Sequence, residues 1–316
     1  MKVLIVGAGA VGQVYGRHLA MGGAEVWYLV KPGHAEAAAR GFVLYDLRRS
    51  RQPRPVSFHP VGVLTSTAEV AAHSWNQVWL CISSPALRGP WLDPFLSAIG
   101  HATLVNLTPG LDDLEYLKPR FSAARTVQGL ITLIAWQTPL RTETRPEPGI
   151  AYWFPPLSAS LFDGPVETGA TMAEIRTTLR RGGCPARRQR DAAYLGALAS
   201  AAMLPIIRGI ELEGWSLSRF ARSGRAAMAA QGARESMTVV ARVAGRKSPW
   251  PRHLVTPALL KTLLPLARHV VPFDLEVYLQ HHFTKVRDQT QAMLGEYVTH
   301  GRALGSPVKA IEDLSL

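Results

Sequence analysis

The sequence predicts an α/β protein in which a doubly wound parallel β-sheet precedes a second, all-helical domain. Short β-rich runs alternate with helical stretches up to about residue 130, and a glycine-rich turn joins the first run to the first helical stretch. After residue 190 the chain changes to helical patterns rich in Ala, Leu and Arg. A length of 316 residues suits two domains. We therefore expect a sheet domain at residues 1–189 and a helical domain at residues 190–316.

The elements of the first domain are expected at short apolar runs between turn residues, which is the pattern of buried parallel strands. Their alternation with helical stretches predicts helices on both faces of the sheet. The Pro- and Gly-rich stretch Thr138–Gly149 is expected to be a loop. We expect strands at Lys2–Val6, Glu25–Val30, Val78–Ile82, Thr103–Asn106, Ile150–Phe154 and Ala159–Phe162, and helices at Val11–Met21 and Pro85–Ile99.

Composition argues against several classes of protein. The chain is 47% hydrophobic and 18% charged, as globular proteins are. No run reaches 18 uncharged apolar residues, so we expect no membrane-spanning helix and no membrane partner. Two cysteines cannot make a disulfide framework or a Cys-based zinc site, which favours a reducing, cytoplasmic location. We expect no metal site.

The net charge of +12 raises the question of nucleic-acid binding. The excess of basic residues is spread along the whole chain, without the interleaved aromatic residues of a nucleic-acid surface. We therefore expect no nucleic-acid partner and favour a small anionic ligand. The helical domain could form a homodimer, although no self-complementary pattern demands one.

A G-x-G-x-x-G motif lies between the first expected strand and the first expected helix. The first glycine permits the tight turn, the second allows a pyrophosphate to approach the backbone, and the third lets the helix pack closely on the sheet. The helix N-terminus favours the negative charge of the pyrophosphate. This pattern predicts a Rossmann-type dinucleotide site. The motif consists of Gly7, Ala8, Gly9, Ala10, Val11 and Gly12.

The end of the second expected strand indicates which dinucleotide is bound. Sites for NAD usually carry Asp or Glu there, which accepts a hydrogen bond from the ribose 2′-hydroxyl. This chain has Lys31 instead, whose ammonium would attract a 2′-phosphate. The sequence therefore favours NADP(H) over NAD(H), the alternative being that Lys31 is only a solvated residue at a strand end.

The chain from Gly7 to Phe42 resembles the ketopantoate reductase (2-dehydropantoate 2-reductase) family in its fingerprint, short helix, second strand and following basic residue. The resemblance implies that Lys31 contacts the 2′-phosphate of NADP. It also extends to Val78–Ser84, where family members often carry a further lysine for the cofactor. Ser83 and Ser84 stand there in this chain.

The stretch from Asn106 to Gly110 resembles the loop of the family that carries an asparagine against nicotinamide and substrate. Thr108 takes the place of that asparagine, unless the register shifts to Asn106. In the helical domain the family has a catalytic lysine followed four residues later by asparagine. Here Gly196 and Ser200 occupy those places, and Gln289 stands where the family has a substrate-binding carboxylate.

Another group must then replace the missing lysine, because reduction of a 2-oxo acid needs a proton donor and a cation for the carboxylate. The C-terminal segment offers Lys285 as proton donor or carboxylate anchor, with His282 titrating near neutrality and Gln289 beside them. The alternative is a solvated helix flank. We expect Lys285, His282 and Gln289 to form a polar stripe with Tyr278 on one long helix, and Asp288 to lie on the solvent side. The apolar stripe beside it consists of Leu279, Phe283, Val286, Thr290, Met293 and Tyr297.

The function expected from these features is that of an NADPH-dependent oxidoreductase. It would reduce a 2-oxo acid, ketopantoate or a related carbonyl compound, by hydride transfer in a cleft between the two domains. One alternative is a different substrate such as an imine. Another is a protein that binds or senses NADP(H) without turnover. Such a protein would also lack the family's lysine and carboxylate.

Overall fold

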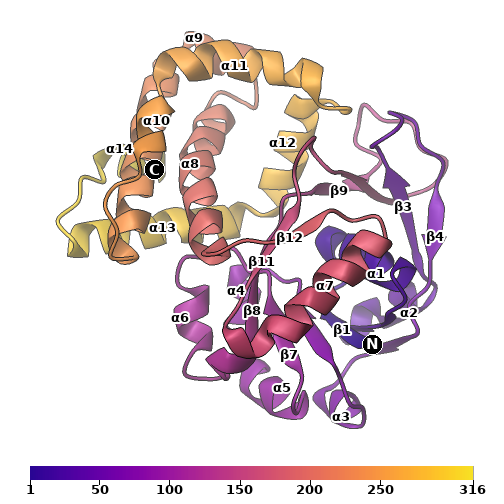
Figure 1. Cartoon of the computed structure of the whole chain (residues 1–316). Coiled ribbons are helices and arrows are strands. Elements are labelled where there is room, and N and C mark those ends of the chain that lie inside the picture. The colour runs from indigo at the N-terminus through magenta and orange to yellow at the C-terminus, as the bar shows by residue number, and fades with distance from the viewer. Residues whose placement is uncertain (316) are drawn as a thin grey trace. The chain divides into compact units, whose positions relative to one another are not determined.

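The computed structural model describes residues 1–315 and divides into two compact units. The first comprises residues 1–109, 113–139 and 143–193, and the second comprises residues 110–112, 140–142 and the chain from Tyr194 onward. The colours of Figure 1 follow the chain through the sheet-containing unit before it enters the helices of the second. The boundary expected at residue 190 lies four residues before the start of the second unit's main segment.

The first unit is built on an eight-stranded sheet with the order β12-β11-β8-β7-β6-β1-β2-β5. All neighbouring pairs are parallel except β8 with β11. The chain crosses from β1 to β2 on one side and reaches β6 on the other, which makes the edge above β1 a topological switch point. The strands are β1 (Lys2–Val6), β2 (Glu25–Leu29), β5 (Gly62–Leu64), β6 (Gln77–Leu80), β7 (Thr103–Asn106), β8 (Thr126–Leu130), β11 (Ser160–Asp163) and β12 (Ala186–Arg188).

Helices cover both faces of this sheet, as the alternating side chains of β1 show. Val3 and Ile5 pack in one core with residues of α1 and α7, whereas Leu4 and Val6 pack in another with residues of α3 and α5. The predicted doubly wound architecture is therefore confirmed. The helices of the unit are α1 (Ala10–Met21), α2 (Ala35–Ala39), α3 (Thr67–Ala71), α4 (Ser84–Leu87), α5 (Leu92–Ala98), α6 (Asp113–Leu117) and α7 (Gly169–Arg181).

A second, four-stranded sheet was not predicted from the sequence. Its order is β4-β3-β10-β9, and its side chains Phe42, Phe58 and Tyr152 share a core with α1. The expected strand Ile150–Phe154 belongs to this sheet, where it is displaced by one residue. The strands are β3 (Phe42–Asp46), β4 (Val56–Phe58), β9 (Ile134–Thr138) and β10 (Gly149–Trp153).

The expected helix Pro85–Ile99 is in fact two helices, α4 and α5. The break contains Gly89 and Pro90, and the residue before a proline is disfavoured in helical conformation. Strands β1 and β7 have the predicted bounds, and β2 and β6 end one and two residues earlier than predicted.

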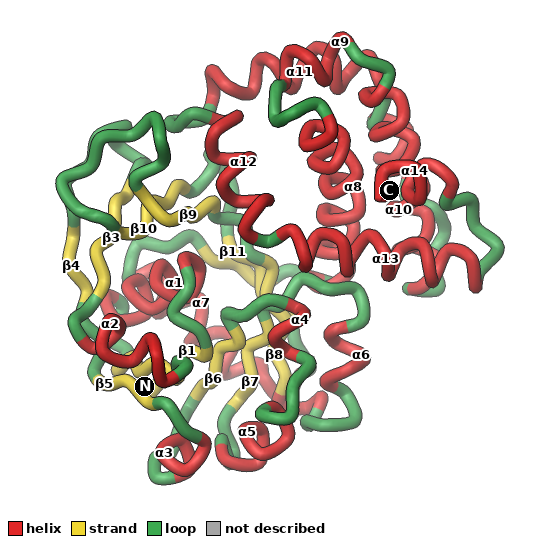
Figure 2. Tube along the Cα trace, turned by 180° about the vertical axis from the view of Figure 1, so that it is seen from behind, coloured by secondary structure: helices red, strands yellow, loops and turns green. Residues whose placement is uncertain are grey.

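The second unit consists of helices and loops (Figure 2). The long C-terminal helix expected from the sequence is interrupted, because Val286 leaves helical geometry at φ −107° and ψ 25°. Lys285 ends one helix and Arg287 begins the next. The helices are α8 (Ala192–Leu212), α9 (Leu217–Arg222), α10 (Arg225–Val243), α11 (Pro257–Val270), α12 (Leu275–Lys285), α13 (Arg287–Ala303) and α14 (Lys309–Ser315).

By length and composition alone, α8 is apolar enough to cross a membrane. The run of uncharged residues in this helix stops at Arg208, whose guanidinium pairs with Glu211 at 2.9 Å. Ile207 and Ile210 of α8 are buried within the helical unit. Of the most apolar 18-residue stretch of α8, 33% is buried in the structure.

Candidate functional site

The turn after β1 is built as the glycine motif predicts. Gly7 has φ +96°, a left-handed conformation that glycine adopts freely. A Cβ atom at Gly7 would lie 2.8 Å from the carbonyl oxygen of Cys81, at the end of the neighbouring strand β6. Only a glycine therefore fits between β1 and β6 at this point.

The second and third glycines have different surroundings. A Cβ at Gly9 would meet no atom within 4 Å, whereas a Cβ at Gly12 would collide with the carbonyl oxygen of Gly7. Gly9 is the N-cap of α1, no side chain caps the helix there, and its first turn carries no acidic residue. The amide groups of this turn are therefore accessible to an anion above Gly9, and the residues present fit a dinucleotide pyrophosphate.

Three residues that the sequence analysis did not single out hold this turn in place. The side-chain amide of Gln13 donates a hydrogen bond to the carbonyl oxygen of Ala8 at 2.8 Å. The hydroxyl of Tyr28 in β2 donates to the carbonyl oxygen of Gly12, also at 2.8 Å. Any side chain at Gly16 would collide with that hydroxyl. The only feature of the sequence that could have revealed this contact is Gly16, a glycine inside an expected helix.

Lys31 lies at the same edge of the sheet as the glycine turn. The amide of Gly7 donates to the carbonyl oxygen of Leu29 at 3.0 Å, which ties the ends of β1 and β2 together. Lys31 follows two residues later, is exposed and has extended geometry (φ −63°, ψ 145°) before a short 3-10 helix at Pro32–His34. This position suits the predicted contact with a 2′-phosphate, which stays a prediction.

The serines after β6 differ from one another. Ser83 is half-buried and is the N-cap of α4, accepting a hydrogen bond from the amide of Ala86 at 3.4 Å. Ser84 is only 2% exposed, and its hydroxyl donates to Asp113 at 2.6 Å. The Ser84 hydroxyl thus has an internal partner 29 residues away. A contact of Ser83 or Ser84 with the cofactor stays a prediction.

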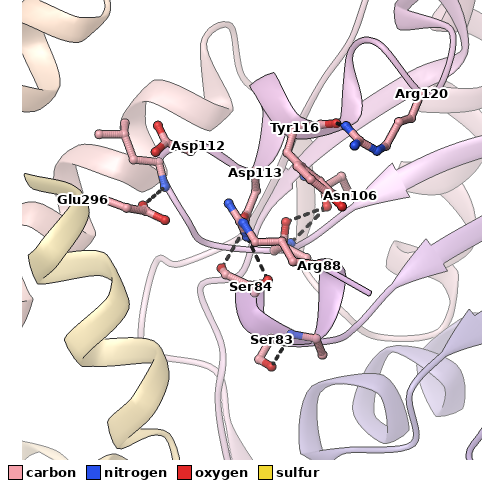
Figure 3. A network of polar contacts seen from close by, with 12 residues as sticks. Ser83, Ser84, Arg88, Asn106, Asp112, Asp113, Tyr116, Arg120 and Glu296 are labelled. Atoms are coloured by element: carbon pink, nitrogen blue, oxygen red, sulfur yellow. Dashed lines mark hydrogen bonds and ion pairs between the residues drawn. The ribbon is translucent and has the colours of Figure 1, made fainter. Parts of the chain in front are cut away.

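Asp113 is the centre of a small polar network, which Figure 3 shows from close by. Its carboxylate is 1% exposed, accepts from Ser84 on one oxygen and pairs with the guanidinium of Arg88 at 2.5 Å on the other. Arg88 also donates to the carbonyl oxygen of Ser84 at 2.8 Å. The network fixes the segment after β6 to the start of α6, and therefore joins the loops that follow β6 and β7.

Asn106 organises the loop after β7. Its side chain is 2% exposed and donates to Gln128 at 3.0 Å. Its carbonyl oxygen accepts from the amide of Thr108 at 3.2 Å and from the hydroxyl of Thr108 at 2.9 Å. Thr108 therefore turns its hydroxyl toward Asn106, and both side chains shape the loop that was predicted to face nicotinamide.

The continuation of this loop belongs to the second unit. The amide of Leu111 donates to Glu296 of α13 at 3.0 Å, and Asp112 contacts the imidazole of His300 at 2.7 Å. Figure 3 shows Glu296 reaching the backbone of the loop beside Asp112. Sequence patterns could not reveal these contacts, which join residues 185 and 188 positions apart.

The proposed catalytic residues of the helical unit lie on two helices. Lys285 is exposed at the end of α12, and within residues 1–315 its ammonium has no hydrogen-bond or ion-pair partner. Gln289 lies beyond the break at Val286, in the first turn of α13. The expectation that the polar and apolar stripes lie on one continuous helix is therefore wrong. The burial of the apolar stripe is confirmed at Leu279, Phe283, Thr290, Met293 and Tyr297, and Asp288 is exposed as predicted.

His282 is half-buried and stacks on the ring of Tyr278 at a centroid distance of 5.4 Å. The pKa of His282 is lowered to about 4, chiefly by burial and also by the neighbouring charges of His281 and Lys285. The expectation that His282 titrates near neutrality is therefore wrong, because the imidazole stays neutral at pH 7. A neutral imidazole can still donate or accept a hydrogen bond.

The thiol of Cys81 lies beside the glycine turn, where burial raises its pKa. It is therefore protonated at pH 7 and a poor nucleophile. Among residues 1–315, no three His, Cys, Asp or Glu side chains are grouped so that they could hold a metal ion.

Residues 3–143 match the family model described as ketopantoate reductase PanE/ApbA. No curated protein matches the sequence. Among solved structures, a 2-dehydropantoate 2-reductase from Methylococcus capsulatus is 17% identical, with a TM-score of 0.69 and coverage of 100% of this chain and 94% of the other. A PanE/ApbA family ketopantoate reductase from Ralstonia eutropha JMP134 is 21% identical, with a TM-score of 0.68 and coverage of 100% and 96%.

A D-mandelate dehydrogenase in complex with NADH and anilino(oxo)acetate is 14% identical to this chain, with a TM-score of 0.72 and coverage of 100% and 96%. These structures share the predicted architecture over the whole chain. The sequence resemblance to ketopantoate reductases is confirmed for residues 3–143.

Proposed function

We propose, from the ketopantoate reductase domain in residues 3–143, that this protein is an NADPH-dependent oxidoreductase that reduces a 2-oxo acid. The observation that carries the proposal is the glycine turn. Gly9 leaves open space above the uncapped N-terminus of α1, at the switch point of the parallel sheet.

Several residues of the first unit would hold the cofactor. The backbone amides at the start of α1 bind the pyrophosphate, and Gln13 and Tyr28 keep those amides in position. The ammonium of Lys31 binds the 2′-phosphate. When bound, the nicotinamide supplies the hydride. The preference for NADPH rests on Lys31 and not on the fold, because the D-mandelate dehydrogenase of similar fold was solved with NADH.

The substrate half of the reaction needs a group that stabilises the developing alkoxide and supplies its proton. We assign this task to Lys285, because its ammonium has no other partner within residues 1–315 and the histidine beside it is neutral. His282 then orients the substrate by a hydrogen bond and does not provide the proton. Gln289 can donate a hydrogen bond to a carboxylate without adding charge.

A second candidate function is binding or sensing of NADP(H) without turnover. It is favoured by Gly196 and Gln289, which stand where the family has its catalytic lysine and its carboxylate. An imine substrate is the remaining alternative within oxidoreductase chemistry.

Loss of NADPH absorbance during incubation with a panel of 2-oxo acids tests the proposal. Oxidation that depends on both protein and 2-oxo acid supports the enzyme. Tight NADPH binding without oxidation of any 2-oxo acid contradicts it and supports the sensor, and oxidation with imines alone supports the remaining alternative.

A further inference from the structure

The helical unit contains an apolar cavity with a volume of about 280 Å³. Four helices, α8, α9, α11 and α12, contribute its ten lining residues, all of which are apolar. They include Ala199, Met203, Ile210, Leu217, Leu264 and Leu279. The cavity therefore offers no hydrogen-bond partner to a polar group, and burying a hydroxyl there would be unfavourable.

The size of the cavity suits a hydrocarbon group larger than a single ring. An apolar cavity of about 150 Å³ stays dry and accommodates benzene. The space here therefore has room for a phenyl group with further carbon atoms, or for a branched alkyl chain. Its volume approaches the lower end of the range found for small-molecule pockets.

The cavity has a closed end and an open end. Ile210 and Leu217 are each 1% exposed and lie where α8 ends and α9 begins. Met203 is 44% exposed and Ala199 is exposed, both nearer the start of α8. Access is therefore from the side on which Ala199 and Met203 lie, with the flexible Met203 side chain at the rim.

Polar residues follow the apolar lining at this open end on two helices. On α8, Ser200 shares a face with Met203, because a spacing of three residues returns to one side of a helix. On α12, Leu275 and Leu279 share a face with His282 by the same spacing.

Figure 1 shows that these two helices run in opposite directions within the unit, α8 toward α9 and α12 toward α13. The polar end of α8 therefore lies at the same end of the cavity as the polar end of α12. Lys285 comes one helical turn after His282, about 4.5 Å further along the axis.

We propose that the substrate is a 2-oxo acid with a bulky hydrocarbon side chain, which occupies this cavity while its 2-oxo acid group faces His282 and Lys285. The inference rests on the proposed reductase function and names its substrate class. Ketopantoate itself fits less well, because the hydroxyl group on its side chain would find no partner among the lining residues.

The kinetic test compares pyruvate, 2-oxobutanoate, 2-oxopentanoate, 2-oxo-4-methylpentanoate and phenylpyruvate. We expect kcat/KM to rise about fourfold for each added methylene until the cavity is full. Ala202→Phe, which fills the cavity from α8, should remove this gain. Ala258→Phe, at an exposed position of α11 outside the cavity, is the matched control and should behave as wild type. Equal kcat/KM along the series would overturn the proposal.

A binding measurement separates this inference from the proposed function. Calorimetry with 3-phenylpropanoate and hexanoate, which cannot be reduced at C2, reports on the cavity without turnover. Binding that is lost in Ala202→Phe and kept in Ala258→Phe supports the cavity even if no 2-oxo acid is reduced. Equal affinity of the wild type and Ala202→Phe for these acids would overturn the proposal. It would also be overturned if Ala202→Phe changed the oligomeric state while the hydrocarbon tail of the acid had no effect on binding. That result would assign the cavity to a second copy of the chain.

Discussion

The hydroxyl of Tyr28 donates a hydrogen bond to the carbonyl oxygen of Gly12 at 2.8 Å, and both residues are buried. The bond links the second strand of the sheet to the helix that follows the glycine turn. Space for the hydroxyl exists only because Gly16 has no side chain. The position of the proposed dinucleotide site thus depends on a contact that lies outside the six-residue motif.

The first prediction concerns this contact. Gly16→Ala should lower the free energy of unfolding by about 1–3 kcal/mol, because the new methyl group overlaps the Tyr28 hydroxyl. The double variant Gly16→Ala with Tyr28→Phe should recover part of this loss, since removing the hydroxyl relieves the overlap. Urea denaturation measures both changes. Additive effects of the two substitutions would show that the residues do not interact as the structure indicates.

The second prediction separates two glycines of the motif. Gly9→Ala should fold with nearly wild-type stability, because its Cβ meets no protein atom, but should bind NADPH at least about tenfold more weakly. Gly12→Ala should instead destabilise the fold, because its Cβ collides with the carbonyl oxygen of Gly7. Thermal unfolding and calorimetry with NADPH check the two variants side by side. If Gly9→Ala kept the NADPH affinity of the wild type, the pyrophosphate could not bind against this turn as proposed.

The third prediction is a pH dependence of stability that comes from His18. The imidazole is fully buried, its Nδ1 lies 2.7 Å from the carbonyl oxygen of Gly182, and burial lowers its pKa to about 4. The unfolded chain therefore binds a proton more readily than the folded protein between pH 6.5 and pH 4. Stability from this residue is present above pH 6.5 and falls by about 3 kcal/mol as the pH approaches 4.

Urea denaturation between pH 7 and pH 4 measures this fall. His282, whose pKa is also lowered to about 4, contributes in the same direction. His18→Gln keeps a donor for Gly182 and should flatten the pH profile without removing the share of His282. A profile as steep as that of the wild type would rule out His18 as a source.

The fourth prediction concerns Lys285. Lys285→Ala should lower kcat on 2-oxo acids by about a hundredfold or more, since it removes the proposed proton donor. NADPH affinity should stay unchanged. Lys261→Ala, at an exposed lysine of α11, serves as the matched control and should keep full turnover. Undiminished turnover in Lys285→Ala would rule out the assignment.

The sequence predicted most of the parallel sheet because its strands are short apolar runs with turn residues on both sides, as at Lys2–Val6 and Thr103–Asn106. The second sheet escaped prediction. Its strand Val56–Phe58 is three residues long and its first two residues are exposed, so no periodic pattern marks it. The helix break at Val286 carries neither proline nor glycine and has no local signal.

The candidate site was predictable where the backbone itself demands a residue type, as at Gly7 and Gly12. It was less predictable where a distant partner decides the role of a side chain. Ser84 is used internally because Asp113 reaches it from another loop, and His282 stays neutral because burial lowers its pKa. Asp113 lies 29 residues from Ser84 in the sequence.

The most direct test of the central claim is a calorimetric comparison of NADPH and NADH binding to the wild-type protein and to Lys31→Ala. We predict that the wild type binds NADPH about tenfold more tightly than NADH, because the ammonium of Lys31 pairs with the 2′-phosphate. Lys31→Ala should lose this preference and keep its affinity for NADH, whereas Lys118→Ala should match the wild type. Equal affinities of the wild-type protein for the two coenzymes would contradict the account.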